Sequence, residues 1–214
     1  MPDSAPKPII SKKILVVEGK DEINFFEGLL KYLNMSDCQI EDVGGKDQFH
    51  KKIPALKLRA GFVQADGNSF VTHLAIIRDQ NGDNALKSIK EILKKVGFIP
   101  PDNHGQFSNA NPKVGIFIMP GETIEGSMLE DLCLKTVEDH PAIKCADKFV
   151  SCVSKLKTMP KNISKAKVAL FRAQAFLATQ PETVDCVGLA AKKQYWDFDS
   201  PALNELKRFL KNLE

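Results

Sequence analysis

Short apolar segments alternate along the chain with longer segments in which apolar residues repeat at helical spacing. Strands are expected over 14–17, 38–43, 73–77 and 114–119, and helices over 21–33, 48–58 and 84–96. Three of the four strand segments are almost continuously apolar, which is typical of strands covered on both faces of a sheet. The order of the segments predicts an α/β fold, in which a Rossmann-like parallel sheet of about four strands has helices on both faces.

The two ends of the chain differ from this alternating middle. Residues 1–11 contain three prolines and are expected to form a flexible arm. The α/β domain is expected to span 12–140, with a surface loop over 97–112 and a mostly helical segment over 123–140. Residues 141–214 are expected to form a helical extension that packs on the same core, with helices over 143–157, 164–178 and 201–213.

Composition narrows the class of protein without defining its function. The 214 residues are 43% hydrophobic and 27% charged, and the formal net charge is only +3, so the chain as a whole is not strongly basic. No apolar run reaches the roughly 20 residues of a membrane helix, and the N-terminus lacks the pattern of a secretory signal. Five cysteines, none of them in a C-x-x-C pair, are typical of a reduced chain. We therefore expect a cytoplasmic protein without membrane contact.

Acidic residues stand after three of the four expected strands. Glu18 follows the first strand, and Asp79 and Asp83 follow the third, with Asn81 between them. Glu130 lies in the helical segment that comes after the fourth strand. Because parallel strands end at one edge of a sheet, these groups are expected to converge there. Each carboxylate alone fits an ordinary solvated loop, and it is their joint occurrence that indicates a site.

Carboxylates that are held close together repel each other unless a cation or bound protons reduce their charge. Such oxygen ligands favour Mg²⁺ or Mn²⁺, which can hold a phosphate and activate a water molecule. The expected strand at 38–43 is followed by Gly44, Gly45 and Lys46. The two glycines would let a phosphate approach the backbone closely, and Lys46 together with Lys20 would offset its charge.

The sequence VVEGKDE (16–22) resembles the first motif of Toprim domains, the catalytic modules of topoisomerases, bacterial primases and OLD-family nucleases. The sequence IIRDQNGD (76–83) lies where that family has its D-x-D motif. The resemblance implies that Glu18 is a metal ligand or general acid/base and that Asp79 is a metal ligand. Asn81 replaces the second acid of the motif, so it can supply a neutral oxygen but no charge, and Asp83 would take the place of that acid.

A wider similarity, to a group of small Toprim-related proteins, covers about residues 12–214. It includes the GGK at 44–46, the LEDL at 129–132 and the ending AAKKQYWDFDSPALNELKRFL at 190–210. By this resemblance Glu130 is a further metal ligand. The fold that the resemblance implies is a Toprim-like α/β domain with a helical C-terminal extension.

Two functions follow from the resemblance, and the sequence leaves both open. The first is Mg²⁺- or Mn²⁺-dependent phosphoryl transfer on DNA or RNA, most simply by a nuclease, with Glu18 and Lys20 at the catalytic centre. The second is a Toprim-fold binding or regulatory module that has lost the chemistry, as the change at Asn81 suggests. Such a module would act with a partner protein, for example a separately encoded ATPase.

Two features of the C-terminal region also have alternative interpretations. Tyr195, Trp196 and Phe198 lie within four residues of each other and are expected to pack the last helix onto the sheet, although aromatic residues near lysines can also stack on bases. Lysines recur over 144–167, and Arg172 follows them. A solvated helical face is the simpler interpretation of this basic stretch, and contact with a phosphate backbone is the other.

Overall fold

A five-stranded sheet lies at the centre of the computed structural model, which describes residues 7–80, 84–156 and 163–213. Its strands, in the order β2-β1-β3-β5-β4, are Cys38–Asp42, Lys13–Val17, His73–Asp79, Lys113–Met119 and Gln106–Phe107. The first four strands in this order pair in parallel, and the two-residue β4 pairs antiparallel with β5. The α/β fold expected from the sequence is therefore confirmed. The loop expected over 97–112 contains β4.

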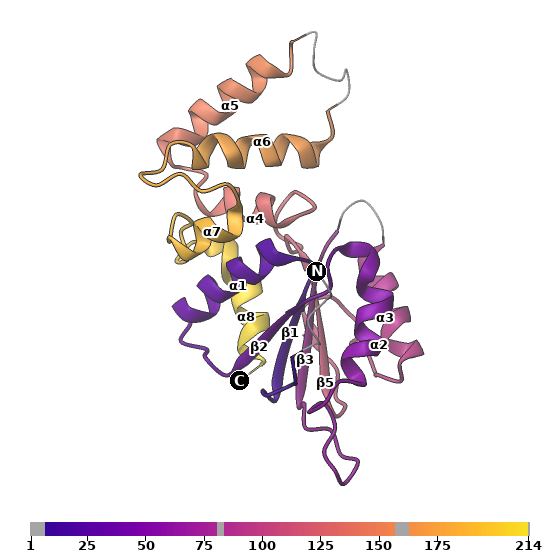
Figure 1. Cartoon of the computed structure of the whole chain (residues 1–214). Helices are drawn as coiled ribbons and strands as arrows, with labels where there is room; N and C mark the ends of the chain where they lie inside the picture. Colours follow the sequence, from indigo (N-terminus) through magenta and orange to yellow (C-terminus); the bar gives the residue numbers. More distant parts are fainter. Residues whose placement is uncertain (1–6, 81–83, 157–162, 214) are drawn as a thin grey trace, which may run out of the picture.

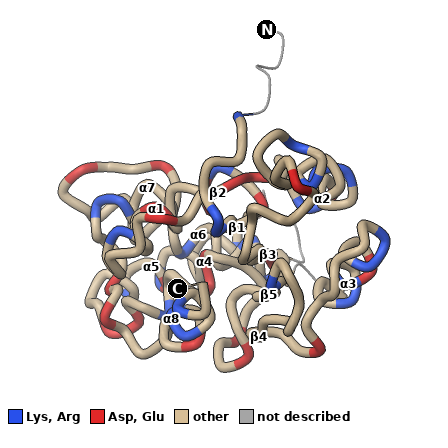
Figure 2. The backbone as a smooth tube through the Cα atoms, turned by 90° about the horizontal axis from the view of Figure 1, so that it is seen from below, with Lys and Arg blue, Asp and Glu red and all other residues tan. Residues whose placement is uncertain are grey.

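Helices cover both faces of this sheet, as Figure 2 shows with the strands seen from one end. One face packs against α1 (Lys20–Tyr32) and α8 (Asn204–Lys211), with α7 (Val187–Lys192) packed on α1, and the other face packs against α2 (Phe49–Lys57) and α3 (Ala85–Lys95). Side chains alternate between the faces along each strand. In β1, Leu15 and Val17 join the first apolar core while Ile14 and Val16 join the second. This two-sided burial explains why the strand segments are continuously apolar.

The direction in which successive strands are added to the sheet reverses between β1 and β3, which are themselves parallel. From β1 the chain passes through α1 to β2 on one side, whereas from β3 it passes through α3 to β5 on the other side. Those two helices cover opposite faces of the sheet. Ligands of open α/β sheets bind in the crevice outside the carboxyl ends of strands at such a switch point. In this chain the residues at that position are Glu18 and Asp79.

After β5 the chain forms α4 (Leu129–Thr136), and the helical extension expected over 141–214 then begins with α5 (Pro141–Val153) and α6 (Lys165–Leu177). The pair of α5 and α6 forms a hairpin that stands beyond α4, away from the sheet (Figure 1). Trp196 is buried, stacks on Phe176 with ring centroids 5.2 Å apart, and donates its indole N–H to the Val187 carbonyl. The cluster therefore packs, but on other elements than expected: Trp196 lies on α6 and Phe198 contacts Phe25 of α1, whereas the last helix meets the sheet through Phe209. No helix within the described residues is long and apolar enough to cross a membrane.

Two helical expectations need correction. The segment 123–140 was expected to be mostly helical, but α4 occupies only Leu129–Thr136. Gly126 has φ +151°, and Asp131 accepts hydrogen bonds from the N–H groups of Ser127 and Met128, which caps the helix at that point. Helix α7 was not predicted, because six residues with a glycine among them are too few to show helical periodicity.

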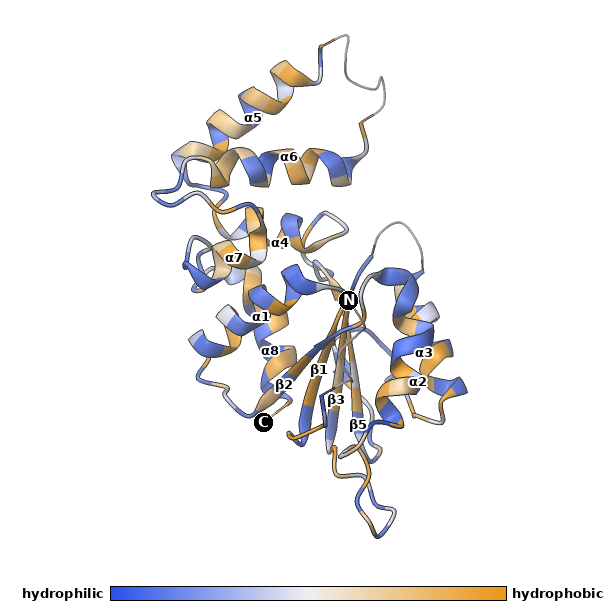
Figure 3. Ribbon diagram, viewed as in Figure 1, coloured by the Kyte–Doolittle hydropathy of each residue, from blue (hydrophilic) through white to orange (hydrophobic). Residues whose placement is uncertain are grey.

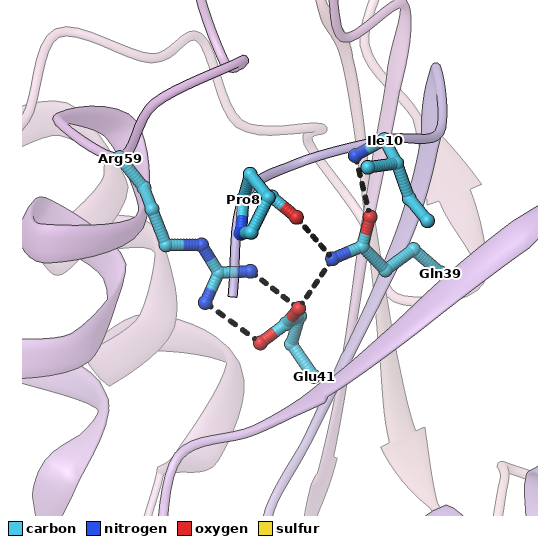
Figure 4. Close-up of polar contacts among 5 residues, drawn as sticks. All are labelled: Pro8, Ile10, Gln39, Glu41 and Arg59. Atoms are coloured by element: carbon cyan, nitrogen blue, oxygen red, sulfur yellow. Dashed lines mark hydrogen bonds and ion pairs between the residues drawn. The ribbon is translucent and has the colours of Figure 1, made fainter. Parts of the chain in front are cut away.

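The chain before β1 runs beside the edge strand β2. Figure 4 shows Gln39 accepting a hydrogen bond from the N–H of Ile10 at 2.9 Å and donating to the Pro8 carbonyl at 3.4 Å, while Arg59 pairs with Glu41. Ile9 is buried and donates its N–H to Ala60. The flexible arm was expected over 1–11, and its residues 8–11 are thus held against the sheet edge. The arm is thus held to β2 through the side chain of Gln39.

Glu205 links the last helix both to a histidine that contacts β5 and to the loop after β5. His104 accepts a hydrogen bond at Nδ1 from the N–H of Ile118 at 2.8 Å, so its Nε2 carries the proton and donates to Glu205 Oε1 at 2.7 Å. The other oxygen of Glu205 accepts from the N–H of Glu122 at 3.0 Å. One carboxylate thus satisfies donors from two separate segments and fixes α8 against them.

Replacing Glu205 with alanine should therefore destabilise the fold. The change leaves the His104 Nε2–H and the Glu122 N–H without their acceptor, and we expect a loss of about 1–3 kcal/mol in the free energy of unfolding. Urea unfolding measures it. The matched control is Glu91→Ala on the exposed side of α3, with an expected change within about 0.5 kcal/mol. Equal effects of the two substitutions would show that the linkage contributes nothing.

Candidate functional site

Glu18 and Asp79 end the two adjacent strands at the switch point. Glu18 directly follows β1 and Asp79 is the last residue of β3, where only 6% of it is exposed. Burial raises the pKa of Asp79 well above its ordinary value, and the charge of Glu18 raises it further. The Oε2 atom of Glu18 is buried and has no hydrogen-bond partner within the described part of the chain. An acceptor in this state is available to a ligand.

Two further carboxylates act on this pair. Glu22 lies one helical turn after Glu18 in α1, and Glu130 lies in the first turn of α4. Burial is the main cause that raises the pKa of Glu130 to about 7, and the charges of Asp21 and Glu22 add to it. Burial also raises the pKa of Glu22, as does the charge of Glu18. Four acidic groups from three elements therefore repel one another inside the fold.

Cations near these groups offset the repulsion only in part. Arg78 is buried beside Asp79, and its charge, like that of Lys46, lowers the pKa of Glu18. Burial outweighs both, so the pKa of Glu18 stays above its ordinary value. The N–H groups of Asp79 and Lys46 also favour the charged form of Glu18. The site therefore keeps an excess of negative charge or binds protons at neutral pH.

The loop after β2 forms an open groove next to Glu18. Its volume is about 470 Å³, and its walls come from Glu18 and from residues 44–48. Gly44 and Gly45 have φ +79° and +113°, which other residues rarely adopt, and Gly45 donates its N–H to the Glu18 carbonyl at 2.8 Å. Lys46 is exposed at the end of this turn. The glycines thus bring the loop and Lys46 to the same edge as the acidic groups.

The sequence predicted some of this arrangement and missed other parts of it. The structure brings Glu18, Asp79 and Glu130 close enough for their charges to interact, directly or through Glu22, and places the GGK loop beside Glu18. Lys20 is exposed at the first residue of α1. Asn81 and Asp83 lie outside the described residues, so their predicted roles stay predictions.

Two neighbours of the site were not predicted. The signal for Glu22 was its place in the first turn of the expected helix, only four residues after Glu18 and at the helix end that starts from the same sheet edge. Arg78 carried no signal, because a charged residue at the end of an apolar strand is normally solvated. Within the described ranges, no group of three or more His, Cys, Asp or Glu side chains has an arrangement that could hold a metal ion.

Comparison with known proteins places the chain in a family. A family model described as "Protein of unknown function (DUF3226)" matches residues 12–214. The chain belongs to the DUF3226 family. No curated protein matches this DUF3226 chain.

Solved structures that match the DUF3226 chain come from the C-terminal region of the OLD protein of Xanthomonas campestris pv. campestris. One is 13% identical, with a TM-score of 0.49, over 95% of this chain and 94% of that chain. A second structure of the same region is 12% identical, with a TM-score of 0.40, over 95% of this chain and 98% of that chain.

Removing one repelling carboxylate should stabilise the DUF3226 chain in the absence of divalent metal. Asp79→Asn keeps an oxygen that can accept from the Leu129 N–H and removes a buried charge. We expect the melting temperature in EDTA to rise by about 2–4 °C, or roughly 1 kcal/mol. Differential scanning calorimetry measures it, with the exposed Asp102→Asn as the control. A fall of several degrees would instead show that Asp79 makes structural contacts that asparagine cannot keep.

The stability of the metal-free protein should also depend on Glu130. A pKa of about 7 in the folded state, against 4.5 ordinarily, means that the folded chain binds more protons than the unfolded chain between these values. Stability should therefore fall as the pH rises from about 5 to about 8. Thermal melts in EDTA across this range should show a flatter profile for Glu130→Gln, whereas Glu91→Gln should keep the profile of the wild type. An unchanged slope in Glu130→Gln would refute this assignment.

Proposed function

We propose that this protein is a divalent-metal-dependent phosphoryl-transfer enzyme that acts on nucleic acid, most simply as a nuclease. The observation that carries the proposal is the pair of Glu18 and Asp79 at the switch point between β1 and β3, with a glycine-lined groove beside them. The resemblance of VVEGKDE (16–22) to the first Toprim motif supports it, since that motif places its glutamate after a short strand and before a helix.

The chemistry of the available atoms fits Mg²⁺ or Mn²⁺. Carboxylate oxygens are the ligands that these ions prefer, and the unpaired Oε2 of Glu18 together with the buried Asp79 offers such oxygens at one edge. The charge of Glu130 acts on Asp79 and raises its pKa, so Glu130 offers a further carboxylate near this edge. Asn81 and Asp83, which follow Asp79 along the chain, are proposed as the remaining ligands. When bound, the ion would neutralise the carboxylates, polarise the phosphorus centre and favour attack by water.

The residues of the chain have separate roles in this proposal. Glu18 holds the metal and moves a proton as general acid or base. The backbone of Gly44 and Gly45 approaches a phosphate oxygen at the groove, and Lys46 places a positive charge against it. Lys20, exposed at the start of α1, adds a second positive charge at the same edge. The N-terminus of α1 is itself favourable for an anion.

A second candidate function is a binding or regulatory module that keeps the fold without the chemistry. Two observations favour it. The first is that Asn81 stands where the Toprim motif has its second acid. The second is that no three His, Cys, Asp or Glu side chains among the described residues are arranged so that they could hold a metal ion. Such a module would bind DNA or RNA, or a partner protein such as an ATPase encoded separately, without cleaving a phosphodiester.

Metal titration followed by a cleavage assay separates these two functions. We expect Mn²⁺ and Mg²⁺ to bind the wild type in titration calorimetry, and the double variant Glu18→Gln/Asp79→Asn to bind at least about tenfold more weakly, because it loses two charged ligands. The control is Glu91→Gln/Asp102→Asn, which removes two exposed carboxylates elsewhere.

Cleavage of labelled single- and double-stranded DNA and RNA in Mn²⁺ should then disappear in the Glu18→Gln/Asp79→Asn variant and persist in the control variant. Metal binding without cleavage of any of these substrates would favour the binding module. Metal affinity that is equal in the two double variants would refute the site itself.

A further inference from the structure

The segment that spans the α5–α6 hairpin has a large net positive charge, although the chain as a whole is nearly neutral. Residues 141–178 contain eight Lys or Arg and one Asp, a formal charge of +7, whereas the whole chain carries only +3. The remainder of the chain is therefore acidic. The single acid of the hairpin, Asp147, pairs with Arg172 at 2.6 Å and does not offset the lysines. A local charge of this size is the electrostatic signature of a surface that meets an anion.

An apolar groove lies between the two helices of this hairpin. It has a volume of about 520 Å³ and is lined from α5 by Cys145, Ala146 and Phe149 and from α6 by Phe171, Gln174 and Ala175, among others. Phe149 is 53% exposed. Figure 3 shows that hydrophobic residues are frequent in both helices although the hairpin stands away from the sheet. An exposed aromatic side chain in an apolar groove is a feature of binding surfaces.

Lysines border this groove on both sides. On α5, Lys144 and Lys148 are exposed and each directly precedes a residue of the groove wall. On α6, Lys167 lies one turn before Phe171, and its Nζ is 5.6 Å from the centroid of that ring. The surface therefore combines aromatic faces with positive charges a few ångströms away. Single-stranded nucleic acid has the matching chemistry, because its bases have free π-faces and its phosphates are regularly spaced anions.

The hairpin also lies at the end of the sheet where the candidate site is. It stands beyond α4, on the side of the sheet from which α1, α3 and α4 depart after the strand ends (Figure 1). The first turn of α4 supplies Glu130 to the acidic edge. A strand held on the hairpin would therefore approach the same edge as the proposed catalytic residues.

We propose that the α5–α6 groove binds single-stranded nucleic acid, with Phe149 and Phe171 stacking on bases and Lys144, Lys148 and Lys167 holding phosphates. The proposal deepens the proposed function, since it names the surface that would deliver the substrate and the form of substrate that it accepts. A duplex is a poorer match, because its bases are stacked on each other and cannot face the phenylalanines. An acidic helix of a protein partner would also match the lysines, but it would not require aromatic rings.

Fluorescence anisotropy with a labelled oligothymidylate, carried out in EDTA, tests this surface without any contribution from divalent metal. We expect Lys144→Glu/Lys148→Glu to weaken binding at least about tenfold and to reduce the salt dependence, because two phosphate contacts are lost. Phe149→Ala should weaken binding about fivefold or more. The matched control is Lys94→Glu/Lys95→Glu, two exposed lysines at the end of α3, which should bind like the wild type.

Additional variants keep the test decisive. Circular dichroism checks the fold of each protein, and Lys144→Gln/Lys148→Gln replaces the charge reversal if that variant unfolds. Glu18→Gln/Asp79→Asn should bind the oligonucleotide at least as well as the wild type in EDTA, so a failure of the catalytic proposal would leave this one standing.

Three results would overturn the proposal. The first is equal affinity of the hairpin variants and the control variant for the oligonucleotide. The second is equal affinity of the wild type for the single strand and for a duplex, with no effect of Phe149→Ala. The third is binding of an acidic amphipathic peptide at the groove together with no binding of the oligonucleotide.

Discussion

Repulsion between carboxylates at the ends of two adjacent parallel strands is the constraint on which the candidate site depends. Glu18 follows a strand whose last four residues are buried, and Asp79 is paired with Met119 of β5, so the sheet fixes the backbone of both residues. The two apolar cores on either face hold this arrangement in place. A fold tolerates such a conflict where a cation or a proton is to be bound.

The helix that follows β5 contributes directly to this edge. The N–H of Leu129 favours the charged form of Asp79, and Glu130 adds a further carboxylate, so α4 acts on the end of β3. Asp131 determines where α4 begins, through its hydrogen bonds to Ser127 and Met128. On the other side of the site, Asp21 accepts the N–H of Gly188 at 2.6 Å and thereby ties α1 to α7. Segments far apart in the sequence are thus needed to complete one site.

The sequence was informative where burial on both faces leaves a strong pattern. The strand positions followed from continuous apolar residues, and Glu18, Asp79 and the GGK loop could be located because they come directly after strands. The strand order could not be predicted from the sequence, because no local pattern indicates that β3 pairs with β1 rather than with β2. The burial of Arg78 depends on a tertiary contact with Phe49, which leaves little trace in local composition. The start of α4 depends on a local cap by Asp131, which the spacing of apolar residues does not show.

The separation of charge within the chain links the hairpin to the acidic edge. The hairpin is basic and the sheet edge is acidic, and the average charge of +3 conceals this difference between two surfaces of the chain. A polyanion attracted by the hairpin would be repelled by Glu18, Asp79 and Glu130 in their ionised forms. One strand can therefore occupy both surfaces only when the carboxylates are neutralised. A divalent cation does this and leaves a net positive charge facing the phosphate, whereas protonation removes the repulsion without adding attraction. If one strand occupies both surfaces as proposed, the charge of the hairpin thus adds an argument for a cation at the sheet edge to the one from the acidic residues.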